Sequence, residues 1–147
     1  MESKKLALCD LYPTIEEVLS SGKSFELPIT GTSMNPLLKA GRDSVEIIKT
    51  DDFGIGDIIF YRRDNGQFVL HRIVGKDTNG YLLCGDNQED IEHGINDTHI
   101  IGVVNRINRK GKIIDRYDPA YLRKVNFWIK VINHRHLPLV VIRKLSK

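Results

Sequence analysis

The sequence predicts a mainly antiparallel β domain of the α+β class, with one helix near each end. Six short runs rich in isoleucine, valine and aromatic residues follow one another at intervals of roughly 8–12 residues, and turn residues separate them. Apolar residues at helical spacing precede the first run and follow the last. A chain of 147 residues fits one domain and can bury a sizeable core.

The first predicted helix precedes the β runs. Its apolar side chains recur at the i, i+4, i+7 and i+8 positions of one helical face, at Leu11, Ile15, Val18 and Leu19. Asp10 suits the N-cap, Pro13 suits the first turn, and Gly22 is a typical C-terminal stop. We therefore expect a helix that begins after Asp10 and ends before Gly22.

Six strands are predicted between the two helices, at residues 25–30, 44–49, 57–63, 67–74, 81–84 and 100–107. Asp64-Asn65-Gly66 lies between the third and fourth strands, and an Asn-Gly pair tolerates the positive φ of a tight hairpin turn. Asp77-Thr78-Asn79-Gly80 is a second turn, with a longer loop, between the fourth and fifth strands. The turns and the strand spacing together predict antiparallel pairing.

The C-terminal segment, residues 119–147, differs from the rest of the chain in charge. It carries seven lysines and arginines and no acidic residue, so the first 118 residues sum to −4 within a net charge of +3. Its apolar positions, including Trp128, follow a helical period as far as His134-Arg135-His136. Such a helix either binds an anionic membrane surface or packs its apolar stripe on the β domain. We divide the chain into a β domain with its helix, residues 1–118, and this basic segment.

Composition excludes several classes of protein. There is no apolar run of about 18 residues, so we expect neither a membrane-spanning helix nor a secretory signal. Cys9 and Cys84 make neither a disulfide framework nor a metal cluster. We expect reduced thiols in a cytoplasmic protein that requires no metal and no other cofactor.

Two residues stand out for their chemistry. Ser33 lies in a turn bounded by glycine and proline, within Gly-Thr-Ser-Met-Asn-Pro at residues 31–36. His71 lies in the middle of an apolar, β-branched run, where a titratable ring is out of character. A serine becomes a nucleophile at neutral pH when a base takes its proton, and histidine is the side chain best suited to that task. The pair therefore predicts a serine hydrolase site.

Five short motifs, at residues 31–36, 56–61, 70–73, 85–87 and 101–104, resemble in order and spacing those of the type I signal peptidase superfamily. This superfamily also includes the self-cleaving SOS and phage repressors. The resemblance covers about residues 25–107 and implies a signal-peptidase-like β fold.

The resemblance also implies roles for individual residues. Ser33 would be the nucleophile that attacks a peptide carbonyl, and His71 stands where bacterial signal peptidases have a lysine base. The chain is thus similar to the Ser-His branch, which includes the endoplasmic-reticulum type and relatives in some Gram-positive bacteria. Thr32, Met34 and Pro36 would shape the substrate groove around the nucleophile.

A carboxylate on the second imidazole nitrogen would fix the tautomer of the base and stabilise its charged form. Asp86, in the fourth motif, is the first choice, and Asp90 and Glu92 are alternatives because relatives carry an acid later in this loop. Gly31 departs from the family, since many signal peptidases have a serine there as an oxyanion donor. The backbone N–H of Ser33 then remains as that donor.

The predicted function is that of a serine endopeptidase. Its substrate would be an extended leader, propeptide or membrane-proximal peptide, held as an added β-strand. Two other functions stay open: a peptide-binding module without catalytic activity, and a repressor-like regulator. Residues 119–147 are the expected contact with an anionic membrane, which would make the cytoplasmic protein peripherally membrane-associated. We expect no specific nucleic-acid partner, because a basic tail alone binds anions without choosing among them.

Overall fold

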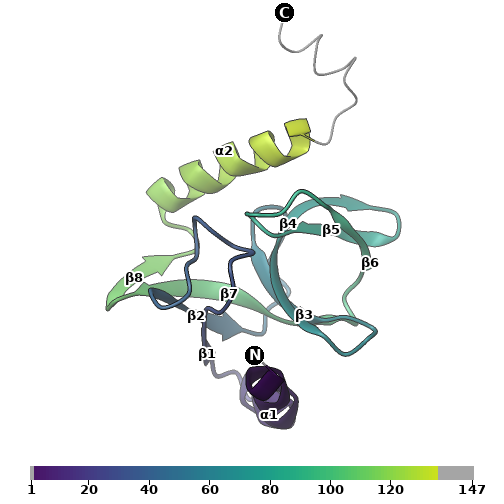
Figure 1. Cartoon of the computed structure of the whole chain (residues 1–147), viewed down its shortest axis with the longest axis vertical. Coiled ribbons are helices and arrows are strands. Elements are labelled where there is room, and N and C mark those ends of the chain that lie inside the picture. The colour runs from purple at the N-terminus through teal and green to yellow at the C-terminus, as the bar shows by residue number, and fades with distance from the viewer. Residues whose placement is uncertain (1, 136–147) are drawn as a thin grey trace, which may run out of the picture.

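The computed structural model describes residues 2–135 and consists of a mainly antiparallel β-sheet with one helix on each of two opposite sides (Figure 1). This confirms the predicted fold class. The elements in chain order are α1 (Glu2–Ser20), β1 (Phe25–Pro28), β2 (Asp43–Ile48), β3 (Ile58–Arg62), β4 (Phe68–Asp77), β5 (Gly80–Cys84), β6 (Glu92–Ile95), β7 (Ile100–Arg109), β8 (Lys112–Asp115) and α2 (Pro119–Arg135).

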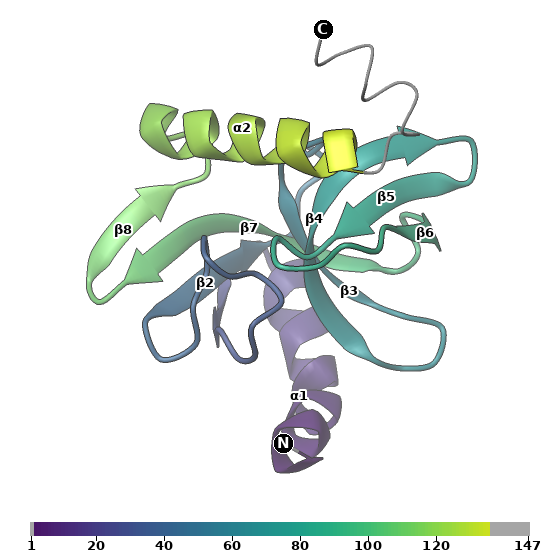
Figure 2. The same cartoon turned by 45° about the horizontal axis from the view of Figure 1, so that its top comes forward.

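The strands form one sheet in the order β1-β2-β7-β3-β4-β5-β6. β8 pairs with β7, and Figure 2 shows the two strands side by side. All pairs are antiparallel, and all six predicted strands are present. The strands β6 and β8 were not predicted. Each has only four residues, and Glu92-His93-Gly94 in β6 lacks the apolar alternation that signals a strand.

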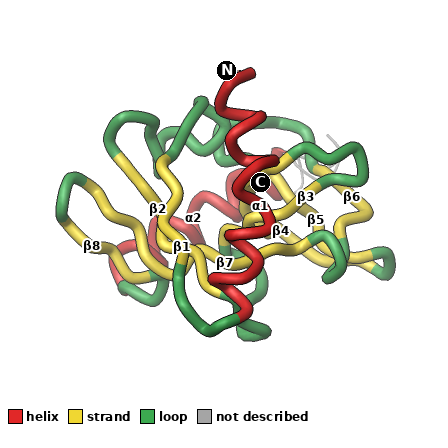
Figure 3. Tube along the Cα trace, turned by 90° about the horizontal axis from the view of Figure 1, so that it is seen from below, coloured by secondary structure: helices red, strands yellow, loops and turns green. Residues whose placement is uncertain are grey.

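The first helix is longer than predicted. It begins at Glu2, so Asp10 is not its N-cap, and Pro13 lies in its interior. Its inner side buries Ile15 and Leu19 against the sheet, and Figure 3 shows α1 crossing this side of the molecule. Gly22, with φ +86°, ends the helix as predicted, because its N–H donates to the Leu19 carbonyl oxygen at 3.1 Å.

The turn between β3 and β4 fixes the register of the hairpin that carries the site. Gly66 adopts φ +89°, and the Arg63 N–H donates to the Gln67 carbonyl oxygen at 2.8 Å. In the resulting register Tyr61 lies opposite Val69, and residue 59 lies opposite His71. Tyr61 and His71 are therefore diagonal neighbours on one face of the hairpin.

The second helix packs its apolar stripe on the β domain. Val125, Ile129 and Ile132 are buried, and the Trp128 indole N–H donates to the Asp86 carbonyl oxygen at 3.1 Å. The basic segment was expected either to bind a membrane or to pack on the β domain. For the apolar stripe of α2 the structure shows packing, so Trp128 is not free to contact a membrane. No helix in residues 2–135 is long and apolar enough to cross a membrane. The predicted helix end at His136 and everything after it lie outside the described residues.

Candidate active site

Ser33 lies in the loop between β1 and β2, which local bonds and buried anchors hold in shape. Gly31 takes φ +76°, a conformation that favours glycine. The Leu38 N–H donates to the Met34 carbonyl oxygen at 2.9 Å, and both side chains are buried in the core. Ser33 itself is half-buried, whereas Thr32 and Pro36 are exposed. The loop thus presents the hydroxyl next to a buried methionine.

A second loop, residues 85–88, holds Ser33 from the other side. The Asn87 N–H donates to the Ser33 carbonyl oxygen at 2.8 Å. A Cβ atom on Gly85 would lie 2.6 Å from that same oxygen, closer than real Cβ atoms approach other atoms. Glycine is therefore required at position 85 for the two loops to meet.

His71 is 6% exposed, and its Nδ1 lies 3.3 Å from the Tyr61 hydroxyl. That hydroxyl donates its proton to Glu92 Oε1 at 2.6 Å. Burial, together with the Glu92 carboxylate, raises the pKa of Tyr61, so the phenol keeps its proton. Because the phenol proton points at Glu92, the oxygen of Tyr61 accepts from His71 Nδ1–H, which leaves Nε2 unprotonated.

Burial is the main reason that the His71 ring is neutral at pH 7. Burial, with the nearby positive charge of Arg63, lowers the pKa of His71 to about 4. Burial would raise the pKa of Glu92, but hydrogen bonds from Arg63 and Tyr61 outweigh it and hold that pKa below its ordinary value. At neutral pH the site therefore contains an uncharged imidazole connected through a phenol to an ionised carboxylate.

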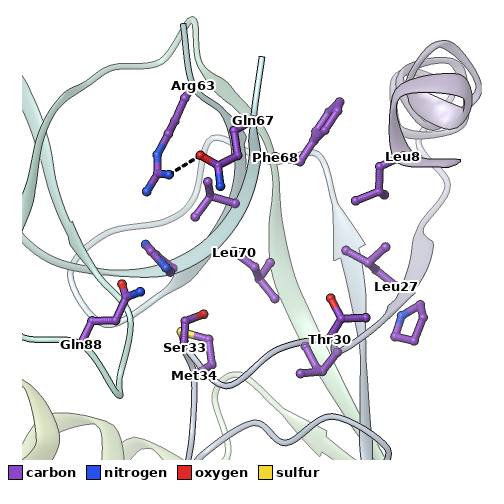
Figure 4. Close-up of a pocket in the computed structure, with 14 residues that line it drawn as sticks. Leu8, Leu27, Thr30, Ser33, Met34, Arg63, Gln67, Phe68, Leu70 and Gln88 are labelled. Atoms are coloured by element: carbon purple, nitrogen blue, oxygen red, sulfur yellow. Dashed lines mark hydrogen bonds between the residues drawn. The ribbon is translucent and has the colours of Figure 1, made fainter. Parts of the chain in front are cut away.

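Ser33 and His71 line the same groove, which has a volume of about 300 Å³. Figure 4 shows Ser33 in this groove with Leu70, Gln88 and Arg63 around it. His71 Nε2 has no hydrogen-bond partner in the described chain and is not among the fully buried unpaired atoms, so it is open to solvent. No hydrogen bond in residues 2–135 joins the Ser33 hydroxyl to His71.

A second pocket, of about 410 Å³, adjoins the groove and shares Arg63, His71 and Gln88 with it. Asp90 and Glu92 line this pocket. Both carboxylates thus share a pocket with His71, and Glu92 is connected to the imidazole through the Tyr61 hydroxyl.

Asp86, the first choice for that position, has a different partner. Its two carboxylate oxygens accept from Arg72 Nε and Nη2, each at 2.8 Å, and both side chains are fully buried. Successive residues of a strand face opposite sides, so Asp86 meets Arg72 while His71 points away. The geometry therefore does not support Asp86 as the acid that orients the imidazole.

Sequence reasoning missed Tyr61 and Arg63. The Asn65-Gly66 turn could have identified Tyr61, because counting back from the turn places it diagonal to His71. No group of three or more potential ligands that could hold a metal ion occurs among the described residues. A comparison with models of known protein families gives no match, and no curated protein matches the chain.

Proposed function

We propose that this protein is a serine endopeptidase of the signal-peptidase-like type, with Ser33 as nucleophile and His71 as general base. One observation carries the proposal: a neutral imidazole, with Nδ1 engaged and Nε2 open, lines the same groove as Ser33. Nε2 would take the hydroxyl proton as Ser33 Oγ attacks the peptide carbonyl carbon.

The remaining steps follow from the same two side chains. When the C–N bond breaks, the imidazolium returns its proton to the leaving amine, and an acyl group stays on Ser33 Oγ. Water, deprotonated by the same imidazole, then hydrolyses the ester. In each charged stage the Glu92 carboxylate stabilises the imidazolium through the Tyr61 hydroxyl. Glu92 and Tyr61 are therefore positioning residues in this proposal.

The groove suits an extended peptide as substrate. Its lining includes apolar side chains from α1, β1, the β1–β2 loop and β4, namely Leu8, Leu27, Met34, Phe68 and Leu70. β1 lies at the end of the sheet, so its outer edge is unpaired and can hold main chain as an added strand. A leader, a propeptide or a membrane-proximal peptide in the cytoplasm fits this site.

A serine-directed fluorophosphonate probe tests the proposal. We expect labelling of the full chain that Ser33→Ala abolishes and His71→Ala reduces by at least about a hundredfold. Ser24→Ala and His93→Ala, which change exposed residues away from the groove, should label normally. Labelling that survives Ser33→Ala, or no labelling of the folded wild type, would contradict the proposal.

The second candidate is a peptide-binding module without catalytic activity. It is favoured by the Ser33 hydroxyl, which makes no hydrogen bond to His71 in the described chain. Apo sites, however, often tighten such contacts only when substrate binds. Peptide binding by a wild-type protein that resists the probe would favour this second function.

A further inference from the structure

The outward side of α2 carries a row of exposed cations with an aromatic ring among them. Arg123, Phe127 and Lys130 stand at i, i+4 and i+7, so they share one face of the helix, and Lys124 lies beside them. All four are exposed, and Phe127 is 66% exposed, the largest exposed fraction among the large hydrophobic side chains described. We name these four residues the α2 outer face.

We propose that the α2 outer face binds an anionic lipid bilayer. Charge complementarity supports this partner, because the 17 residues of α2 include no acid that could pair with the cations. Each Lys or Arg near a negatively charged bilayer strengthens binding about fivefold. An aromatic ring at the same level enters the boundary between headgroups and acyl chains, where its apolar surface is removed from water.

The aromatic ring favours a bilayer over a nucleic acid. Phosphate groups of a duplex would contact the cations of the outer face, but Phe127 would gain nothing from them and would remain in water. On a bilayer, the ring and the cations contribute together. The exposed ring therefore decides between two partners that the charges alone would fit equally well.

The outer face is a fixed surface because the opposite side of α2 is anchored. Val125 and Ile132 are buried, and Trp128 donates to the Asp86 carbonyl oxygen. Figures 1 and 2 show α2 lying along one side of the molecule, with α1 on the opposite side, so nothing described covers this face. A flat bilayer can approach the helix along its length.

Co-sedimentation with vesicles tests the proposal on the full chain. We expect binding to phosphatidylcholine vesicles that contain about 30% phosphatidylserine, and little binding to phosphatidylcholine alone. Arg123→Glu with Lys130→Glu should weaken binding about a hundredfold or more, and Phe127→Ala about tenfold. The matched control, Lys23→Glu with Lys49→Glu, changes the net charge equally at exposed positions near the end of α1 and should bind normally.

The outcomes are distinct. Every variant retains residues 136–147, so a difference between them reports on α2. Loss of vesicle binding in the two α2 variants, with unchanged thermal unfolding and a normal control, supports the proposal. It is overturned if the wild type does not bind, if the control loses binding equally, or if a 25-base-pair duplex binds more tightly than the vesicles. The assay needs no catalysis, so its result is independent of the probe experiment on Ser33.

Discussion

His71 and Arg72 are adjacent in β4, yet they belong to two polar arrangements of opposite character. Arg72 is fully buried and bonds Asp86 twice, the Gly56 carbonyl oxygen at 2.7 Å and the Tyr121 hydroxyl at 3.3 Å. His71 bonds through Nδ1 only, and its other nitrogen, Nε2, is unbonded and open to solvent. The nitrogens of Arg72 are all bonded within the protein, whereas His71 keeps one nitrogen that can bond a substrate or another side chain.

The difference suits the Arg72–Asp86 pair to a structural role and His71 to a chemical one. A buried ion pair in which every guanidinium nitrogen is bonded can hold elements together, and Arg72 with Asp86 joins β4, the 85–88 loop and α2. It has no free atom with which to act on a substrate. A buried imidazole with one free nitrogen contributes less to packing, but it can accept a proton. Four experiments test whether the two side chains differ in this way.

The largest expected effect is on stability. Arg72→Met leaves Asp86 buried without its cation, which costs about 3–5 kcal/mol in the free energy of unfolding. Urea denaturation measures this loss. The control is Arg106→Met, whose exposed side chain makes only long ion pairs, of 3.8 and 3.9 Å, and should lose less than about 1 kcal/mol. Equal losses for the two variants would show that the Arg72–Asp86 pair does not hold these elements together.

The next effect is on reactivity. Tyr61→Phe removes the acceptor of His71 Nδ1–H, so the tautomer with a free Nε2 is no longer favoured. We expect the rate of fluorophosphonate labelling to fall about 10–100-fold, and its dependence on pH to change. Tyr81→Phe removes a hydroxyl from an exposed bond to Asp97 and serves as the matched control. A normal rate for Tyr61→Phe would mean that the phenol does not position the base.

The 85–88 loop connects the Arg72–Asp86 pair to the loop of Ser33. Adding one methyl group at Gly85 is therefore a test of whether the two regions are coupled. Gly85→Ala places Cβ against the Ser33 carbonyl oxygen, so a loop must shift, at a cost of roughly 2 kcal/mol in stability. Labelling of Ser33 should slow as well. Gly54→Ala is the control, because Gly54 has open space around it and no positive φ. If Gly85→Ala changes neither the stability nor the labelling rate of Ser33, the two loops move independently.

The smallest effect is the dependence of stability on pH. The pKa of His71 is lowered to about 4 in the folded chain, so between pH 6.5 and 4 the unfolded chain binds more protons than the folded one. This contribution to the free energy of unfolding is fully present above pH 6.5 and is lost as the pH falls towards 4. At pH 5 the loss amounts to about 1–2 kcal/mol. Urea midpoints at pH 7 and 5 should therefore differ more in the wild type than in His71→Asn. Labelling by the probe should stay constant above about pH 5.

The turn residues of the sequence predict more of the site's geometry than the positions of its acidic residues do. Asp64-Asn65-Gly66 determines the β3–β4 register, and the register places Tyr61 beside His71. The third acid could not be predicted in this way. Residues 85–92 leave β5 and return as β6, and no periodicity says which carboxylate of such a loop meets the imidazole.

Helix boundaries illustrate a second limit. Asp10 and Pro13 match the preferences of a helix start, but α1 continues through them because preferences of single residues are weak compared with packing of the whole helix. The charge of the C-terminal segment was visible in the sequence. Its apolar stripe was visible too, but only the structure shows that this stripe is buried on the β domain.

Pro28 affects the tendency of the protein to associate with other copies of itself at high concentration. The Ile29 N–H donates inward to the Asp43 carbonyl oxygen, so by alternation the backbone nitrogen of residue 28 faces the open edge of β1. Proline has no hydrogen to offer there. Any strand added across this edge, from a neighbouring copy or from a substrate, lacks a bond at that point and must pair with the rest of β1, which discourages aggregation through long-lived sheet extension.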